Sequence, residues 1–307
     1  MLNRRTFIRI LAGGAAASML PLDNLRAFPF PGEDPCTFSV VKGSDSAAAV
    51  RKAVELIGGM NSFVSKGDIV FVKPNISWDR PPVQAATTNP AVVETVITMV
   101  LEAGAKRVIV ADNTCNDARR SYTNSGIKTA AENAGADVPF MEKRKFAKTD
   151  LGGEILKMWD VYREVLEADK IINIPIAKHH GLSQVTLSMK NLMGLVGGNR
   201  SMMHQKLPES VVDLAAFFRP TLTILDAVRI LTANGPQGGT LKDVRRLDTI
   251  AASTDLVRID AFGITLFGDA FPSSDPADFR HIGLAAERGL GSADFAGAGF
   301  RKVTLES

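Results

Sequence analysis

Short apolar segments alternate along the chain with segments whose apolar residues recur at the 3.6-residue period of a helix. The apolar runs predict strands over residues 68–72, 107–111, 138–141, 170–174, 221–225, 247–251 and 300–305. The helical patterns predict helices over residues 45–56, 89–104, 124–134, 161–168, 208–218, 256–267 and 277–288. This alternation predicts an α/β fold, Rossmann-like, with a mostly parallel sheet covered by helices on both faces.

Residues 28–307 are expected to form a single α/β domain. An ambiguous segment near 150–160 leaves two α/β halves as an alternative. The segment 77–88 has turn residues and no periodicity, which is typical of an active-site loop or lid.

Residues 169–198 combine a buried strand with a basic turn. The strand 170–174 ends at Pro175, and the turn K-H-H-G at 178–181 is predicted to open a helix. The apolar face of that helix comprises Val185, Met189, Leu192 and Val196. Lys190 is the only charged residue from 183 to 198, and an unpaired buried charge is costly, so Lys190 needs a partner or a water-filled cleft.

Polar residues follow five of the predicted strands. They are Lys73, Asn75, Asp112, Asn113, Lys178, His179, His180, Asp226, Thr254 and Asp255. Ligands of parallel α/β sheets bind beyond the carboxyl ends of the strands, so we expect these residues to meet at one cleft. Ordinary surface turns and a lysine that reaches out to solvent are the alternatives.

The predicted cleft suits a small anionic ligand or cofactor. Lys73, Lys178 and Lys190 would bind carboxylate or phosphate oxygens. Asn75, Asp112, Asn113, Asn191 and Arg200 complete the predicted binding set. His204 and Arg200 could close over an anion from the loop after the predicted helix.

The leading functional hypothesis is an enzyme linked to redox metabolism. Its candidate catalytic residues are His179, His180, Lys190 and Asp226. One of the two histidines would donate or accept a proton, or bind a metal, while Asp112 or Asp226 would orient it.

Two other classes stay open. A metal-dependent enzyme would use His180, His204 and Asp226 as ligands, with Cys115 as a further donor, and these atoms would suit zinc, iron or nickel. A noncatalytic subunit or binding protein of a redox complex would only carry the ligand. The usual dinucleotide, P-loop, hydrolase and zinc-protease motifs do not occur after the predicted strands.

The formal net charge of +3 comes from the first 27 residues, which hold four arginines against Asp23. Beyond them, basic and acidic residues are equal in number, and no basic stripe for nucleic acid is present. The pair Arg4-Arg5, then Phe7 and an apolar run over 10–20, resembles a twin-arginine signal that would direct export to the periplasm. The run is too short to span a bilayer, and an uncleaved amphipathic terminus is the alternative.

Four motifs resemble the uncharacterised family known as domain of unknown function 362. They are V-K-P-N at 72–75, T-T-N-P at 87–90, K-H-H-G with S-M-K-N-L-M-G over 178–194, and I-L-D-A at 224–227. The resemblance covers about residues 66–270 and implies no settled reaction. Many relatives carry a ferredoxin-like cysteine cluster, but this chain has only Cys36 and Cys115, so it cannot ligate an iron-sulfur cluster alone.

Overall fold

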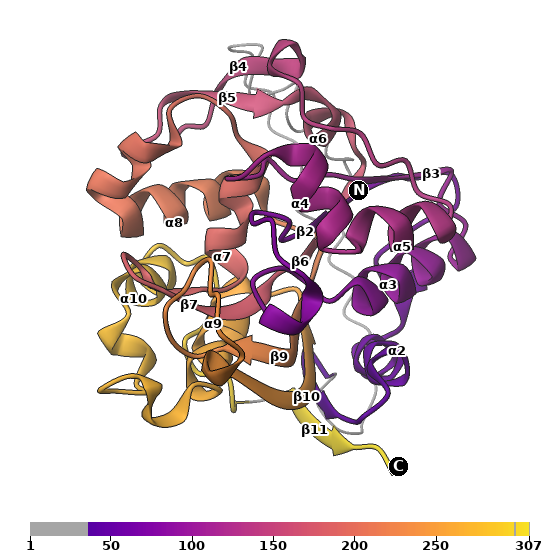
Figure 1. Cartoon of the computed structure of the whole chain (residues 1–307), viewed down its shortest axis with the longest axis vertical. Coiled ribbons are helices and arrows are strands. Elements are labelled where there is room, and N and C mark those ends of the chain that lie inside the picture. Colours follow the sequence, from indigo (N-terminus) through magenta and orange to yellow (C-terminus); the bar gives the residue numbers. More distant parts are fainter. Residues whose placement is uncertain (1–35, 298, 307) are drawn as a thin grey trace, which may run out of the picture.

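The strands form a nine-stranded main sheet and a separate two-stranded sheet in the computed structural model (Figure 1). The structure describes residues 36–297 and 299–306, so the predicted leader over residues 1–27 lies outside the described residues. The main sheet comprises β1 (Phe38–Lys42), β2 (Ile69–Pro74), β3 (Arg107–Val110), β6 (Lys170–Ile174), β7 (Ile176–His180), β8 (Gln184–Thr186), β9 (Leu222–Leu231), β10 (Val244–Ser253) and β11 (Phe300–Thr304). The smaller sheet pairs β4 (Phe146–Asp150) with β5 (Met158–Tyr162), so the segment near 150–160 is a hairpin.

The centre of the main sheet is parallel. Strands β3, β2, β6 and β9 lie side by side in one direction, and β7 continues the line of β6 along β9. β10 and β1 follow in antiparallel steps, and β11 pairs in parallel with β1. The predicted α/β sheet of mostly parallel strands is confirmed, and among its described strands only β10 and β8 run opposite to the others.

Helices cover both faces of this sheet, as predicted (Figure 1). They are α2 (Ser46–Leu56), α3 (Pro90–Glu102), α4 (Ala118–Asn124), α5 (Ile127–Asn133), α6 (Arg163–Glu167), α7 (Ser188–Asn191), α8 (Leu207–Phe218), α9 (Leu256–Thr265) and α10 (Arg280–Glu287). Strand side chains alternate between the faces, so Phe71 joins the core under α7, α8 and α9, whereas Val70 and Val72 join the core under α2, α3 and α5. No helix in the described part of the chain is long and apolar enough to cross a membrane.

The prediction of a basic turn followed by one long helix over 178–198 is wrong. Residues 176–186 form the hairpin of β7 and β8, in which His179 faces Val185, and only the four residues of α7 and a 3-10 turn follow. The cause is tertiary, because β7 pairs with β9, about 50 residues further along the chain. Val185 and Met189 pack into the same core cluster from a strand and a helix, which gives the apparent helical period.

Smaller differences also have local causes. The predicted helix 124–134 begins at Ile127, after Gly126 in a left-handed conformation with φ of 73°, and a separate helix α4 precedes it. The predicted strand 138–141 is reduced to one bridge between Asp137 and Ile109. Strand β1, which follows a proline-rich segment, was not predicted.

Candidate functional site

A pocket of about 600 Å³ opens at the carboxyl edge of the parallel strands. The loops after β2 and β3, the β7–β8 hairpin, α7 and the 3-10 segment η5 (Arg200–Lys206) form its walls. We call it the main pocket, and the residues that line it include Asn75, Ser77, Trp78, Cys115, Lys178, His180, Leu182, Thr186, Lys190, Asn191, Gly194, Arg200 and His204.

A buried ion pair lies directly behind the pocket wall. Lys73 Nζ is 2.8 Å from Asp112 Oδ1, and both side chains are almost fully buried. Burial lowers the pKa of Lys73, while the Asp112 carboxylate acts in the opposite direction. A Cβ atom at Gly194 would lie 1.7 Å from Asp112 Oδ1, so only glycine fits between the ion pair and the pocket.

Hydrogen bonds through the side chains of two asparagines link this ion pair to the pocket. Asn191 Oδ1 accepts hydrogen bonds from Lys73 Nζ at 3.1 Å and from Asn75 Nδ2 at 3.0 Å. Asn75 Oδ1 in turn accepts from Lys178 Nζ at 3.0 Å, and Lys178 also donates to the Ala86 carbonyl. Two lysines from different strands are therefore held by amide oxygens at the base of the pocket.

The helix α7 carries Lys190 and is fixed at its start by Asp260. The Asp260 carboxylate accepts hydrogen bonds from the Ser188 and Met189 backbone N–H groups and from the Ser188 hydroxyl. This carboxylate is fully buried, and burial raises its pKa to about 7. Among the described residues, the Lys190 ammonium has no hydrogen-bond or ion-pair partner.

The pocket lysines lose protons more readily than ordinary lysines. Burial, with the nearby Lys190 charge, lowers the pKa of Lys178 to about 7. Burial also lowers the pKa of Lys190 to about 8, and Arg200 adds to the effect. Both side chains therefore exchange protons close to neutral pH, and a bound anion would favour their charged forms.

The two pocket histidines hold opposite tautomers. His180 Nδ1 accepts from the backbone N–H groups of Leu182 at 3.1 Å and Ser183 at 3.3 Å, so the proton of the neutral ring is on Nε2. His204 Nδ1 lies 3.2 Å from the Arg200 carbonyl oxygen, to which it must donate, so Nε2 is the free acceptor. Burial lowers the pKa of both rings, and both are neutral at pH 7.

Arg200 gives the pocket a further positive charge. Its guanidinium donates to the Asn113 and Thr114 carbonyls at 2.7 and 2.9 Å, which ties η5 to the loop after β3. No aspartate or glutamate of the described residues lines the main pocket. Thr186, which is 3% exposed, lines the same pocket, and its hydroxyl has no hydrogen-bond partner among the described residues. A pocket with three cationic side chains and no acidic side chain among the described residues of its lining is suited to an anion.

The structure brings eight of the predicted binding, catalytic or metal-ligand residues into the pocket wall, Cys115 and seven others. The seven others are Asn75, Lys178, His180, Lys190, Asn191, Arg200 and His204. Lys73 and Asp112 lie behind the wall. Asn113 holds the loop after β3 by donating to the Val196 carbonyl, and His179 accepts from the Gly235 N–H and stacks on Phe271, so neither lines the pocket.

Asp226 does not reach the main pocket. It lies within β9 rather than at its end, and its carboxylate accepts from the Asn89 and Val228 N–H groups, which anchors the start of α3. Burial raises its pKa to about 6. Thr254 and Asp255 follow β10, which runs antiparallel to β9, so the expectation that they share the rim is wrong.

The proposed metal ligands are not gathered as a set. Among the described residues, no group of three or more histidine, cysteine, aspartate or glutamate side chains could hold a metal ion. The rings of His180 and His204 stack with centroids 6.4 Å apart. Because His180 Nδ1 accepts two backbone N–H groups, its Nε2 carries the ring proton, and the neutral ring has no free nitrogen lone pair for a metal ion.

Two structural contributors, Asn173 and Asp260, were not predicted. Asn173 lies in the buried strand β6, donates to the Ser188 carbonyl and accepts from Asn191. Asparagine is depleted in strands, so its presence in an apolar run was a usable signal. Asp260 gave no such signal, because its hydrogen bonds to the Ser188 and Met189 N–H groups join residues distant in the sequence.

The fold and pocket define an α/β protein with a positively charged cleft at the carboxyl edge of a mostly parallel sheet. A profile of the domain of unknown function DUF362 matches residues 70–265, and the chain belongs to this family. It is 31% identical over 254 residues to the thylakoid-associated protein sll1697 of Synechocystis, covering 80% of this chain and 74% of that protein. The lactate racemase apoprotein from Thermoanaerobacterium thermosaccharolyticum aligns with a TM-score of 0.47 and 10% identity, over 77% of this chain and 58% of the racemase.

Proposed function

We propose that the chain is an enzyme that binds a small anion through carboxylate or phosphate oxygens in the main pocket. The charge of the pocket carries this proposal, because Lys178, Lys190 and Arg200 line it and no acidic side chain of the described residues does. The Nε2–H of His180 and the unpartnered hydroxyl of Thr186 supply neutral donors. Charge-assisted hydrogen bonds from such groups are the strong ones in anion recognition.

Proton transfer is the chemistry that the pocket residues support best. Lys190, with its pKa lowered to about 8, can act as acid or base near neutral pH. The His204 ring has the opposite tautomer to the His180 ring, so its Nε2 is free to accept a proton. The neutral His180 ring serves as a hydrogen-bond donor that orients the bound anion.

Binding of acetate and of phosphate, measured by titration calorimetry, tests the proposal. Lys190→Met should weaken the binding of the preferred anion by about 10- to 100-fold, because a charged hydrogen bond is worth about 1.5–3 kcal/mol. Lys157→Met, at an exposed lysine outside the pocket, is the control and should bind like the parent chain. If neither anion binds the parent chain, or if Lys190→Met binds equally well, the proposal fails.

We also propose that residues 1–27 direct export of the folded chain through the twin-arginine route. The support is the Arg4-Arg5 pair ahead of a short apolar run. Cell fractionation of the full chain should find it in the periplasm, and Arg4→Lys combined with Arg5→Lys should leave it in the cytoplasm. An equal distribution of both chains would reject this route.

A further inference from the structure

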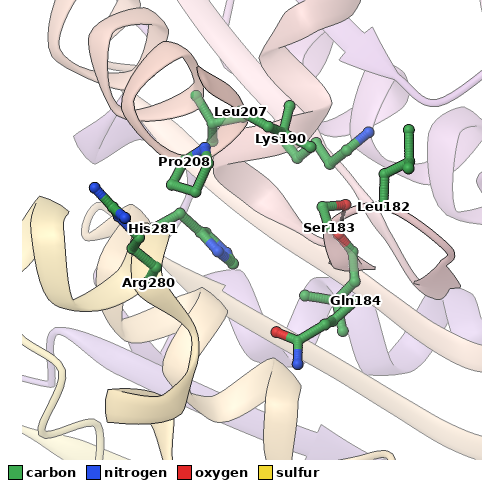
Figure 2. Close-up of a pocket in the computed structure, with 10 residues that line it drawn as sticks. Leu182, Ser183, Gln184, Lys190, Leu207, Pro208, Arg280 and His281 are labelled. Carbon is green, nitrogen blue, oxygen red and sulfur yellow. Dashed lines mark hydrogen bonds between the residues drawn. The ribbon is translucent and has the colours of Figure 1, made fainter. Parts of the chain in front are cut away.

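A smaller cavity of about 150 Å³ adjoins the main pocket (Figure 2). Lys190 and Leu182 line both cavities. We call the smaller one the side pocket, and its other walls include Gln184, Val185, Leu207, Pro208, Val211 and His281. Figure 2 shows Leu182 and His281 on opposite sides of this hollow.

The side pocket differs from the main pocket in its charge. Arg280 at its wall is neutralised by Glu209, whose Oε1 lies 2.5 Å from the guanidinium. Burial lowers the pKa of His281 to about 4, so this ring is neutral at pH 7. Lys190 is therefore the only charge at the side-pocket wall without a partner among the described residues.

The inner wall of the side pocket is apolar. Val185, Leu207 and Val211 belong to the main hydrophobic core, yet they also face this cavity. The Ser183 hydroxyl at the rim donates to the Val185 carbonyl at 2.7 Å and needs no ligand. A cavity with such walls gains most from an apolar occupant, because apolar surface is then removed from water.

Leu182 stands where the two cavities meet. It lies at the tip of the β7–β8 hairpin, and its side chain is 73% exposed. A molecule that fills both cavities would cover this leucine. The ammonium of Lys190 would then contact the charged end of that molecule, and the leucine would contact its apolar end.

We infer that the side pocket receives a short alkyl chain whose anionic head group binds in the main pocket. The ligand class is a small amphiphilic anion, such as a short aliphatic carboxylate. This inference rests on the proposed anion binding, and it adds the part of the ligand that sets specificity.

The test is a calorimetric series from acetate to pentanoate, with methylphosphonate to butylphosphonate as a second head group. Each added methylene should tighten binding about two- to fourfold, the effect of burying one CH₂ group, until the side pocket is full. Val211→Phe should fill the cavity and abolish this gain while leaving acetate or methylphosphonate binding unchanged. Leu182→Ala, at an exposed position, should reduce the gain without any effect on folding, which the melting temperature checks.

The outcomes separate the two proposals. If acetate and methylphosphonate both fail to bind the parent chain, the anion proposal fails and this inference with it. If short anions bind but longer chains bind no better, only the side-pocket inference is overturned. A chain-length gain that survives in both Val211→Phe and Leu182→Ala would place the alkyl chain elsewhere and also overturn it.

Discussion

The base and the mouth of the main pocket use their lysines in different ways. At the base, Lys73 is paired with Asp112 and hydrogen-bonded to Asn191. At the mouth, Lys190 and Arg200 have no acidic partner among the described residues. Lys73 therefore holds loops together, whereas the Lys190 ammonium is available to a ligand and Arg200 contacts the loop after β3 through backbone carbonyls only. Substitutions at the base should lower the free energy of unfolding, and substitutions at the mouth should weaken anion binding.

Asp112→Ala should have the largest effect, because it leaves the Lys73 ammonium buried without a counter-charge. We expect the free energy of unfolding to fall by about 3–5 kcal/mol. The Ile76 N–H, which donates to Asp112 Oδ2 at 2.6 Å, would also lose its partner. Urea denaturation measures the change, and a loss below 1 kcal/mol would contradict the role of the base. Lys73→Met in the same chain should recover part of the loss.

Gly194→Ala should come next, because its Cβ atom would lie 1.7 Å from Asp112 Oδ1 and 2.7 Å from Lys73 Nζ. The pair would have to move, at a cost of about 1–3 kcal/mol of unfolding free energy. Gly283→Ala is the matched control, since nothing lies within 4 Å of its Cβ position and it lies within α10. That control should stabilise the chain by about 0.5–1 kcal/mol.

Lys190→Met tests the mouth of the pocket, and it should raise the free energy of unfolding, whereas the two substitutions above should lower it. Burial lowers the pKa of Lys190 to about 8, so at pH 7 its charge opposes folding. Removing the charge should raise the free energy of unfolding by about 1–3 kcal/mol while it weakens anion binding. Urea denaturation without ligand checks this, and a loss of stability would show that Lys190 has a structural partner.

The smallest effects should be the pH dependence of stability and the pH dependence of anion binding, both of which follow from the pKa of Lys190. The folded-state pKa of Lys190 is lowered from 10.5 to about 8, so the folded chain binds fewer protons than the unfolded chain between these values. Stability should therefore rise as pH increases from 8 to 10.5. Anion affinity should fall about tenfold per pH unit above 8, as the ammonium is lost. Calorimetry with acetate at pH 7 and 9 measures the fall, and Lys190→Met should keep only the part that comes from the Lys178 ammonium.

Local sequence signals were sufficient for elements whose ends are fixed nearby. Asp45 and Asn89 cap α2 and α3 as expected, because a side chain that bonds an N–H two or three residues on is a local event. The same reasoning failed for 178–198. A helical period of apolar residues there came from a strand and a short helix packed into one core.

The sequence by itself determined the fold class, the family and most of the charged residues of the candidate site. The reason is that the periods of strands and helices, the helix caps and the strand ends depend on residues that are close together in the sequence. Only the tertiary structure decided which of these residues have structural partners and which are available to a ligand. It paired Lys73 with Asp112, left Lys190 without a partner, and placed Asp226 under α3, since each outcome depends on residues about 40 to 140 positions apart. Contacts over such distances are set by packing, and packing is a property of the whole chain.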